Sequence, residues 1–329
     1  MDTQDAYRLL AAESSIWAIE PARLHGIAAM MAGGSKAAVH GRGGSVTAPA
    51  GTAIVPIMGP ISHRPSFMSE FFGTGDAGSV VGIRSRLNEA LSNRSVERII
   101  LDIDSPGGVV SGIPELAEDI SAAARTKPVI AVANSLSASA AYWLMSAATE
   151  AVATPSAEIG SVGVFMLHLD ASRALDRAGI DPTFIFSDIS PFKVEGNAFE
   201  SLGGDARDAF QSDVNAIGRQ FIAAVSKGRG LSDGIVKSRF GKGRTLLADD
   251  ALRAGMVDRI ATFEQVLTGR FASPASGRGA AGSTPLPRTT SRERLERERI
   301  ELDALDKRLA QRIDTPSDRR RSRLEELRR

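Results

Sequence analysis

The sequence has no cysteine, only four histidines and an aromatic content of 5%. Without cysteine there are no disulfides, no thiolate nucleophile and no cysteine-ligated metal, and the composition is compatible with a reducing compartment. The histidines are scattered and lack the spacing of metal ligands; they are His25, His40, His63 and His168. We therefore expect no metal centre.

Two further absences narrow the class of protein. No apolar run approaches the roughly 20 residues that span a bilayer, and the polar, acidic start at residues 1–7 is unlike a cleaved secretory signal. The net charge of only +1, with 43% hydrophobic residues, excludes a disordered chain and a globally basic nucleic-acid binder. We expect a cytoplasmic protein with no membrane span and no specific nucleic-acid partner.

Strand-like and helix-like segments alternate from about residue 51 to residue 270, which predicts one α/β domain over this range. Strands are expected at 53–58, 98–103, 129–133, 150–154, 161–167 and 182–186, and helices at 80–92, 112–125, 139–148, 171–178, 205–227 and 245–258. This rhythm predicts a mostly parallel sheet covered by helices.

The flanking segments differ in composition from this domain. Residues 1–50 are expected to contain a helix within 7–32, followed by a flexible Gly- and Ala-rich connection. Residues 271–290 have the composition of a linker, and 291–329 of a charged helical tail. Leucines recur there at heptad spacing over a short length, which leaves open a solvated helix and a self-association segment.

The turn after the strand at 129–133 carries the most informative motif, Asn134-Ser-Leu-Ser-Ala-Ser139-Ala-Ala-Tyr-Trp143. A helix of small residues follows it. Ser139 would therefore lie at a helix N-terminus, where free backbone N–H groups favour negative charge. That place suits a nucleophile whose reaction generates an oxyanion. Taken alone, a strand followed by a Ser-rich turn and an Ala-rich helix is more often a plain structural turn than a catalytic site.

A second turn, Ser105-Pro106-Gly107-Gly108, ends the preceding strand in the chain. Ligands of parallel sheets bind at the carboxyl ends of the strands, where both turns are expected. Gly107 or Gly108 would then supply one oxyanion donor and the Ala140 amide the other. The alternative for this turn alone is again a simple connection between strand and helix.

The third segment, Phe192-Lys193-Val-Glu-Gly-Asn197, carries the only lysine between Lys127 and Lys227. A lysine can take the proton of a serine only where desolvation lowers its pKa toward neutrality. A lone lysine is otherwise a surface charge.

Together, these three segments resemble the S49 peptidases, which include signal peptide peptidase A and the head maturation proteases of tailed phages. Gly160-Ser-Val-Gly-Val164 is similar to the family's Gly-Ser-Ile-Gly-Val. The segment that ends in Ala254-Gly-Met-Val-Asp258 is similar to its Ala-x-x-x-Gly-Leu-Val-Asp. The resemblance covers residues 50–267 and implies a ClpP/crotonase-type β-superhelix, a spiral of βαβ units.

By this resemblance, Ser139 is the nucleophile and Lys193 its general base, and Gly107, Gly108 and Ala140 belong to the oxyanion hole. No metal or organic cofactor is implied. Many cellular members have Gly-Gly-Tyr after the serine, whereas this chain has Ala140-Ala141-Tyr142; alanine keeps the backbone donor. The family forms rings or stacked oligomers, which implies a homo-oligomer and leaves open a dyad within one subunit or between subunits.

The lack of a membrane anchor, the charged tail and the segment Trp17-Ala-Ile-Glu-Pro21 favour the phage branch of the family. The resulting expectation is a serine endopeptidase in the host cytoplasm or prohead. It would process scaffold, capsid or portal proteins and remove its own tail beyond about residue 271. Three alternatives stay open: a conventional Ser139–His168–Asp170 triad, a catalytically inactive assembly protein, and a cellular signal peptide peptidase.

Overall fold

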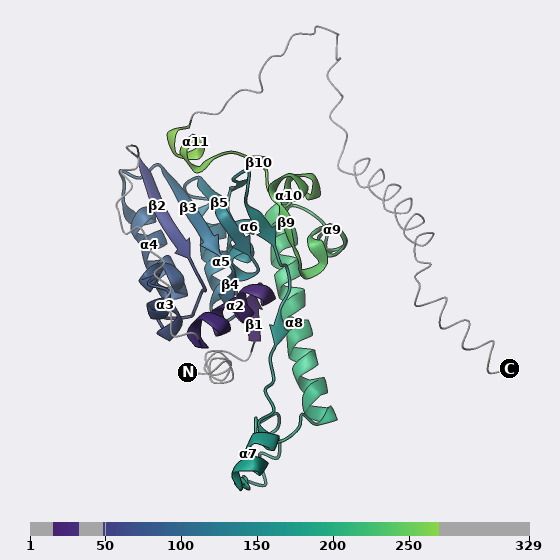
Figure 1. Cartoon of the computed structure of the whole chain (residues 1–329). Coiled ribbons are helices and arrows are strands. Elements are labelled where there is room, and N and C mark those ends of the chain that lie inside the picture. Colours follow the sequence, from purple (N-terminus) through teal and green to yellow (C-terminus); the bar gives the residue numbers. More distant parts are fainter. Residues whose placement is uncertain (1–15, 33–48, 50, 270–329) are drawn as a thin grey trace, which may run out of the picture. The chain divides into compact units, whose positions relative to one another are not determined.

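The computed structural model describes residues 16–32, 49 and 51–269 (Figure 1). The expectations for most of the Gly- and Ala-rich connection, for the linker at 271–290 and for the charged tail at 291–329 fall outside these residues.

A mostly parallel sheet lies at the centre of the described residues (Figure 1). Its strand order is β10-β6-β5-β3-β2, and all of these pairs are parallel. The strands are β2 (Thr52–Met58), β3 (Arg98–Ser105), β5 (Val129–Ala138), β6 (Glu150–Ala153) and β10 (Arg259–Ile260). β7 (Glu158–Gly160) pairs with the end of β5, and β9 (Thr245–Leu247) pairs with β7. The expected mixed α/β fold with a mostly parallel sheet is confirmed.

Several helices cover this sheet and present an apolar stripe to it. In α4, for example, Val80, Ile83 and Leu87 recur at helical spacing and are buried. The α-helices are α2 (Pro21–Ala32), α3 (Phe67–Phe71), α4 (Val80–Ser92), α5 (Ile113–Ala123), α6 (Ala140–Ser146), α7 (Ser172–Ala178), α8 (Gly204–Arg229), α9 (Asp233–Arg239), α10 (Ala248–Ala254) and α11 (Phe263–Thr268). Two 3-10 turns are η1 (Gly75–Gly78) and η2 (Gly241–Gly243).

Helix α6 is the most deeply enclosed helix among those described, with all seven residues buried. Its small residues allow close neighbours. Helix α8 passes so near that a methyl group on Gly228 would clash with the Ser146 carbonyl oxygen. The Trp143 ring stacks on Phe221 with ring centroids 4.4 Å apart. The segment that follows Ser139 is therefore fixed by packing on several sides.

A second, smaller sheet has the strand order β4-β1-β8. Its strands are β1 (Ile16–Ile19), β4 (Gly107–Val109) and β8 (Phe165–Met166), and both pairs are antiparallel. The sequence predicted a helix within 7–32, and α2 is its described part; the strand that precedes α2 was not predicted. The expected strand at 161–167 is reduced to β8, and the expected helix at 245–258 begins only after β9.

The chain between β8 and α8 extends away from the main sheet together with α7 and the N-terminal half of α8 (Figure 1). We call residues 167–203 the arm. The strand predicted at 182–186 is wrong, because these residues pair with no other strand in the described chain. Their β-branched and aromatic composition is typical of a strand, but a strand needs a partner for its backbone groups.

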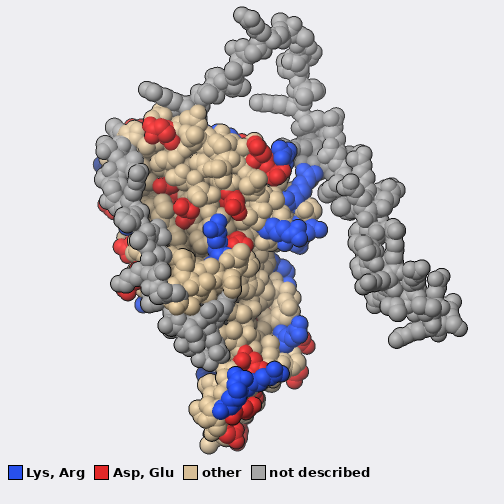
Figure 2. Space-filling model, viewed as in Figure 1, with Lys and Arg blue, Asp and Glu red and all other residues tan. Residues whose placement is uncertain are grey.

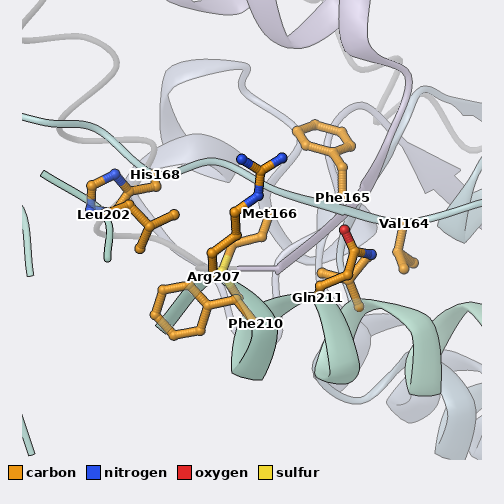
Figure 3. Close-up of a pocket in the computed structure, with 9 residues that line it drawn as sticks. Val164, Phe165, Met166, His168, Leu202, Arg207, Phe210 and Gln211 are labelled. Carbon is orange, nitrogen blue, oxygen red and sulfur yellow. The ribbon is translucent and has the colours of Figure 1, made fainter. Parts of the chain in front are cut away.

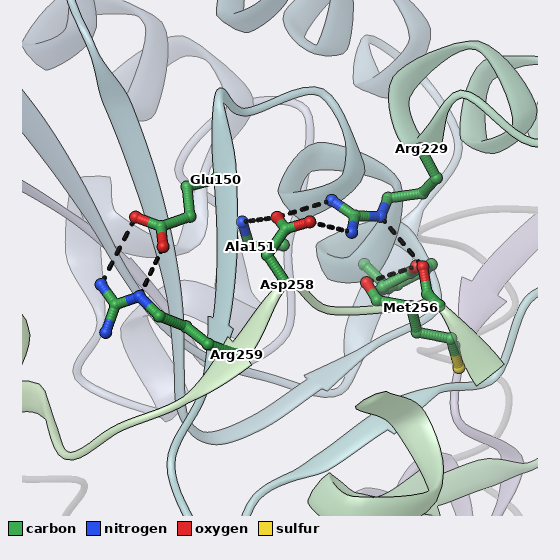
Figure 4. Close-up of polar contacts among 8 residues, drawn as sticks. Glu150, Ala151, Arg229, Met256, Asp258 and Arg259 are labelled. Carbon is green, nitrogen blue, oxygen red and sulfur yellow. Dashed lines mark hydrogen bonds and ion pairs between the residues drawn. The ribbon is translucent and has the colours of Figure 1, made fainter. Parts of the chain in front are cut away.

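A cluster of polar contacts joins the C-terminal elements to α6 (Figure 4). The Arg229 guanidinium donates to both carboxylate oxygens of Asp258, at 3.0 and 2.6 Å, and to the Gly255 carbonyl at 3.2 Å. Asp258 also accepts the Ala151 N–H at 2.8 Å. One step away, the Tyr142 hydroxyl of α6 donates to the Met256 carbonyl at 3.0 Å. Through these contacts, residues 255–258 connect α6 and α8 to the sheet.

Candidate active site

Ser139 lies at the junction of β5 and α6, as the N-cap residue of α6. Its backbone has φ 54° and ψ −117°, a conformation that a non-glycine residue keeps only when its surroundings enforce it. Its N–H donates to the Gly160 carbonyl at 2.7 Å, and its carbonyl accepts the Trp143 N–H at 2.9 Å. Because backbone strain of this kind concentrates at functional sites, the geometry supports the prediction for Ser139.

The Ser139 side chain is enclosed within the subunit. The residue has no exposed surface, and its hydroxyl donates to the Gly163 carbonyl at 3.3 Å, a long hydrogen bond. Gly163 belongs to the Gly-Ser-Val-Gly-Val motif, to which the sequence analysis gave no contact with the serine. The motif begins at the last residue of β7, which pairs with the end of β5 and so brings Gly163 to Ser139.

Gly107 lies directly beside the first amide of α6. A methyl group on Gly107 would be 3.0 Å from the Ala140 nitrogen and 2.9 Å from the Ala138 carbonyl oxygen, and it would clash with the Ala18 carbonyl oxygen. Its φ of 93° also favours glycine. The Ala140 N–H belongs to the first turn of a helix, where amides have no acceptor within the helix. The structure thus brings Gly107 and Ala140 together next to Ser139.

Gly107 and Gly108 make different contacts in this turn. The Gly107 N–H donates to the Ser105 hydroxyl at 3.2 Å, and this hydroxyl donates to the Gly59 carbonyl at 2.7 Å. Gly108 lies against Ile61, where a methyl group would clash with the Ile61 carbonyl oxygen. Of the two glycines, it is Gly107 that contacts the Ala140 amide. The Ser105 contact was not predicted from the sequence.

Lys193 lies in the arm, away from these residues. Its residue is exposed, and its backbone N–H donates to the Ser190 carbonyl at 3.0 Å in a local turn. The Ser139 hydroxyl donates to the Gly163 carbonyl, whereas Lys193 belongs to the arm, which extends away from the main sheet (Figure 1). The chain does not bring these two side chains together. The structure of the single chain therefore does not assemble the predicted dyad.

His168, the base of the alternative triad, lines a hollow of about 360 Å³ between β8 and α8 (Figure 3). Its Nε2 atom lies 3.1 Å from the Asn197 carbonyl oxygen. Asp170 is exposed; hydrogen bonds from the Ser172 hydroxyl and N–H hold the pKa of its carboxyl below the ordinary value. The recorded hydrogen bonds of Ser139 and His168 lead to different partners, so the structure does not assemble this triad within one subunit.

Two carboxylates, Asp102 and Asp104, lie two residues apart on β3, toward the carboxyl end of that strand. Burial raises the pKa of Asp102 to about 6, although the side-chain hydrogen bond from Asn134, 3.1 Å long, acts in the opposite direction. Burial also raises the pKa of Asp104, against a hydrogen bond from Ser135 and the nearby charge of Arg23. The sequence analysis assigned no role to these residues.

The described part of the chain shows neither a metal site nor a membrane-spanning helix. It holds no group of three or more His, Asp or Glu side chains arranged to bind a metal ion. None of its helices is both long and apolar enough to span a bilayer. In the view of Figure 2, basic and acidic side chains lie side by side at the end that carries α7.

Residues 121–271 match the family model described as Peptidase family S49. The capsid assembly protease C of Escherichia phage lambda is 34% identical over 219 residues, which are 66% of this chain and 48% of that protein. The head-tail preconnector protein GP5 of Enterobacteria phage P21 is 32% identical over 251 residues, 76% of this chain and 48% of that protein. Protease 4 of Haemophilus influenzae is 27% identical over 183 residues, 55% of this chain and 29% of that protein.

The chain spans about half the length of the two phage proteins that it matches. The similarity to both confirms the resemblance to the S49 peptidases and to their phage branch.

Proposed function

Since residues 121–271 of this chain belong to peptidase family S49, we propose that the protein is a serine endopeptidase that processes scaffold, capsid or portal proteins during phage prohead maturation. The observation that carries the proposal is the strained backbone of Ser139 at the start of α6, with the Ala140 amide beside Gly107. The name of the phage lambda relative, a capsid assembly protease, supports the choice of substrates.

In the proposed mechanism, the Ser139 oxygen attacks the scissile carbonyl carbon and its proton passes to the Lys193 amine. The carbonyl oxygen becomes an oxyanion, which accepts hydrogen bonds from the Ala140 N–H and from the Gly107 N–H once the latter leaves Ser105. Removing one such donor typically costs about 3 kcal/mol of transition-state stabilisation. The intermediate expels the amine, which takes the proton from Lys193. Water then hydrolyses the acyl-enzyme, with Lys193 again as the base.

The lysine in this mechanism comes from a neighbouring subunit. The arm that carries Lys193 exposes an unusual number of large apolar side chains for a soluble surface, which is typical of a protein-protein contact. They are Ile180, Phe184, Ile185, Phe186, Ile189, Phe192 and Phe199. Ile185 and Ile189 are 96% and 94% exposed. Docking of this surface on a second copy would remove water from around the Lys193 amine, and desolvation disfavours the charged form of such a group.

Three finer points belong to the same proposal. The βαβ units form a ClpP/crotonase-type β-superhelix, the subunits form a homo-oligomer, and the tail beyond about residue 271 is removed by self-cleavage. The last point is tested by the mass of the chain in mature particles: a full-length chain there contradicts self-cleavage.

Labelling with a fluorophosphonate probe tests the nucleophile. We expect the full-length protein to be labelled, Ser139→Ala to be unlabelled and Ser137→Ala to be labelled like the wild type. Ser137 is a matched control, because it is equally buried and its hydroxyl has no hydrogen-bond partner. Labelling that survives in Ser139→Ala, or that is absent from the folded wild type, refutes the assignment.

Co-expression tests the substrates. The wild type or Ser139→Ala is produced together with the scaffold, capsid and portal proteins of the same phage, and new protein termini are identified by mass spectrometry. We expect termini that appear only with the wild type. Identical termini in both samples, with normal capsid assembly, instead favour an inactive assembly protein.

A further inference from the structure

In the small sheet, the space between the outer strands β4 and β8 is one strand wide. We call this space the slot. β4 and β8 form its two walls, and β1 lies between them in antiparallel register with both. Trp17 is opposite Val109 on one side and opposite Phe165 on the other. Since neighbouring strands lie about 4.8 Å apart, the walls are separated by about 10 Å, the space for one extended chain.

Both walls of the slot are continuous with the residues around Ser139. β4 begins at Gly107, which lies beside the Ala140 amide. β8 begins two residues after Gly163, whose carbonyl accepts the Ser139 hydroxyl. An extended peptide in this slot would therefore pass directly by the nucleophile, with its backbone paired to two strand edges. Addition of a strand to exposed edges is a common mode of peptide recognition.

The chain's own β1 has this placement. The Ala18 carbonyl oxygen and the Ala140 nitrogen both lie next to the Cα of Gly107, because a methyl group on Gly107 would meet both. The Glu20 N–H continues the pairing by donating to the Pro106 carbonyl at 2.9 Å. Ala18 has no exposed surface, and neither has Ser139. With β1 in the slot, a peptide has no access to the backbone edges beside Ser139.

We propose that β1 is a tethered substrate mimic, which occupies the peptide-binding slot and must leave it before a substrate can bind. This inference rests on the proposed peptidase function. It also assigns a substrate class: an extended peptide with a small side chain at the position of Ala18, which has no exposed surface and lies beside Gly107.

Two features of the packing allow β1 to leave without unfolding the domain. Of the three buried residues of β1, only the small Ala18 belongs to the main core. Trp17 and Ile19 belong to a separate hydrophobic cluster that consists mostly of β1 and α2. Its fully buried members from the rest of the chain are Phe72 and Val109. In addition, the Trp17 Nε1 atom is buried without a hydrogen-bond partner. Burying an unpaired donor is unfavourable, so release of β1 restores the hydration of this group.

Ala18→Asp tests the inference, because an unpaired carboxylate is costly at a position with no exposed surface and expels the strand. Ala29→Asp is the matched control, since Ala29 lies on the exposed side of α2. Each full-length protein is treated with a small fluorophosphonate and with a tetrapeptidyl phosphonate that carries alanine next to phosphorus. We expect Ala18→Asp to react at least about tenfold faster with the peptidyl probe than the wild type and Ala29→Asp, because the apparent affinity is proportional to the fraction of molecules in which the slot is open. The rate with the small probe should change much less.

Hydrogen exchange on the wild type provides a second test that does not depend on the folding of a variant. When the peptidyl probe occupies Ser139, the amides of residues 17–20 should lose protection, while those of β3 stay protected. The inference is overturned if these amides keep their protection in the labelled protein, or if folded Ala18→Asp reacts with the peptidyl probe no faster than the wild type. If neither probe labels Ser139 in any folded variant, the peptidase proposal itself fails.

Discussion

The Arg229–Asp258 contact gives the sharpest prediction for stability (Figure 4). The Arg229 side chain is only 7% exposed and that of Asp258 is 42% exposed. Replacing Arg229 with methionine keeps much of the aliphatic volume but removes three hydrogen bonds, two to Asp258 and one to the Gly255 carbonyl. It therefore detaches the segment whose Met256 carbonyl receives the Tyr142 hydroxyl of the nucleophile helix.

The size of the effect follows from these contacts. A hydrogen bond to a charged group contributes about 1.5–3 kcal/mol, and Asp258 regains part of its hydration because it is partly exposed. We expect the free energy of unfolding to fall by about 3 kcal/mol, at the lower end of what breaking a buried ion pair costs. For a domain of this size, that corresponds to a Tm about 6–12 °C lower.

The effect should depend on pH. Burial raises the pKa of Asp258, but the hydrogen bonds from Arg229 and from the Ala151 amide outweigh burial and hold the pKa below its ordinary value of 3.8. A carboxyl with a lowered folded-state pKa contributes stability above its unfolded-state pKa and loses it as the pH falls through the folded-state value. The difference between wild type and Arg229→Met should therefore be complete at pH 7 and shrink below about pH 3.8.

Urea denaturation followed by circular dichroism measures this difference. Arg253→Met is the control, because Arg253 and Asp250 form an ion pair whose side chains are 70% and 56% exposed, and such pairs contribute about 0–1 kcal/mol. An Arg229→Met protein as stable as Arg253→Met, or a difference that grows toward low pH, refutes the reasoning.

Two further predictions concern groups near the nucleophile. In urea denaturation, Asp102→Asn should stabilise the protein by about 2 kcal/mol at pH 7.5 but not at pH 4. The folded-state pKa of Asp102, about 6, lies above the ordinary value of 3.8, so ionisation of Asp102 destabilises the fold as the pH rises between these values. An equal increase in stability at both pH values contradicts this cause. Gly107→Ala should slow fluorophosphonate labelling of Ser139 by about a hundredfold or more. Gly179→Ala, at φ 68° and with open space around it, should leave labelling unchanged; equal rates in both variants would remove Gly107 from the oxyanion hole.

The neighbourhood of Ser139 could be predicted because it depends on local and general rules. The apolar strand, the small-residue helix and the serine between them are adjacent in sequence. The meeting of this turn with Gly107 follows from the geometry of a parallel sheet, in which the carboxyl ends of neighbouring strands share one edge. Predicting these elements required no knowledge of contacts between residues that are distant in the sequence.

The elements that sequence analysis missed depend on partners elsewhere. β1 is four residues long, too short for a periodic signal, and it is a strand because β4 and β8 pair with it. The predicted strand at 182–186 has the composition of a strand but pairs with no other strand among the described residues. Lys193, expected in a desolvated site, is exposed in the arm, and in our proposal a second copy of the chain covers it. Composition alone does not distinguish a strand from a segment that packs on another molecule.

The most direct test of the account is complementation between two inactive variants. Ser139→Ala lacks the nucleophile and Lys193→Ala lacks the base, so each homogeneous protein should be inactive toward a peptide substrate. If the two groups meet between subunits, mixed oligomers regain activity, up to about a quarter of the wild-type level at equal amounts under random cyclic assembly. A mixture that exchanges subunits but stays inactive at every ratio, or a Lys193→Ala protein as active as the wild type, would contradict the shared Ser139–Lys193 dyad.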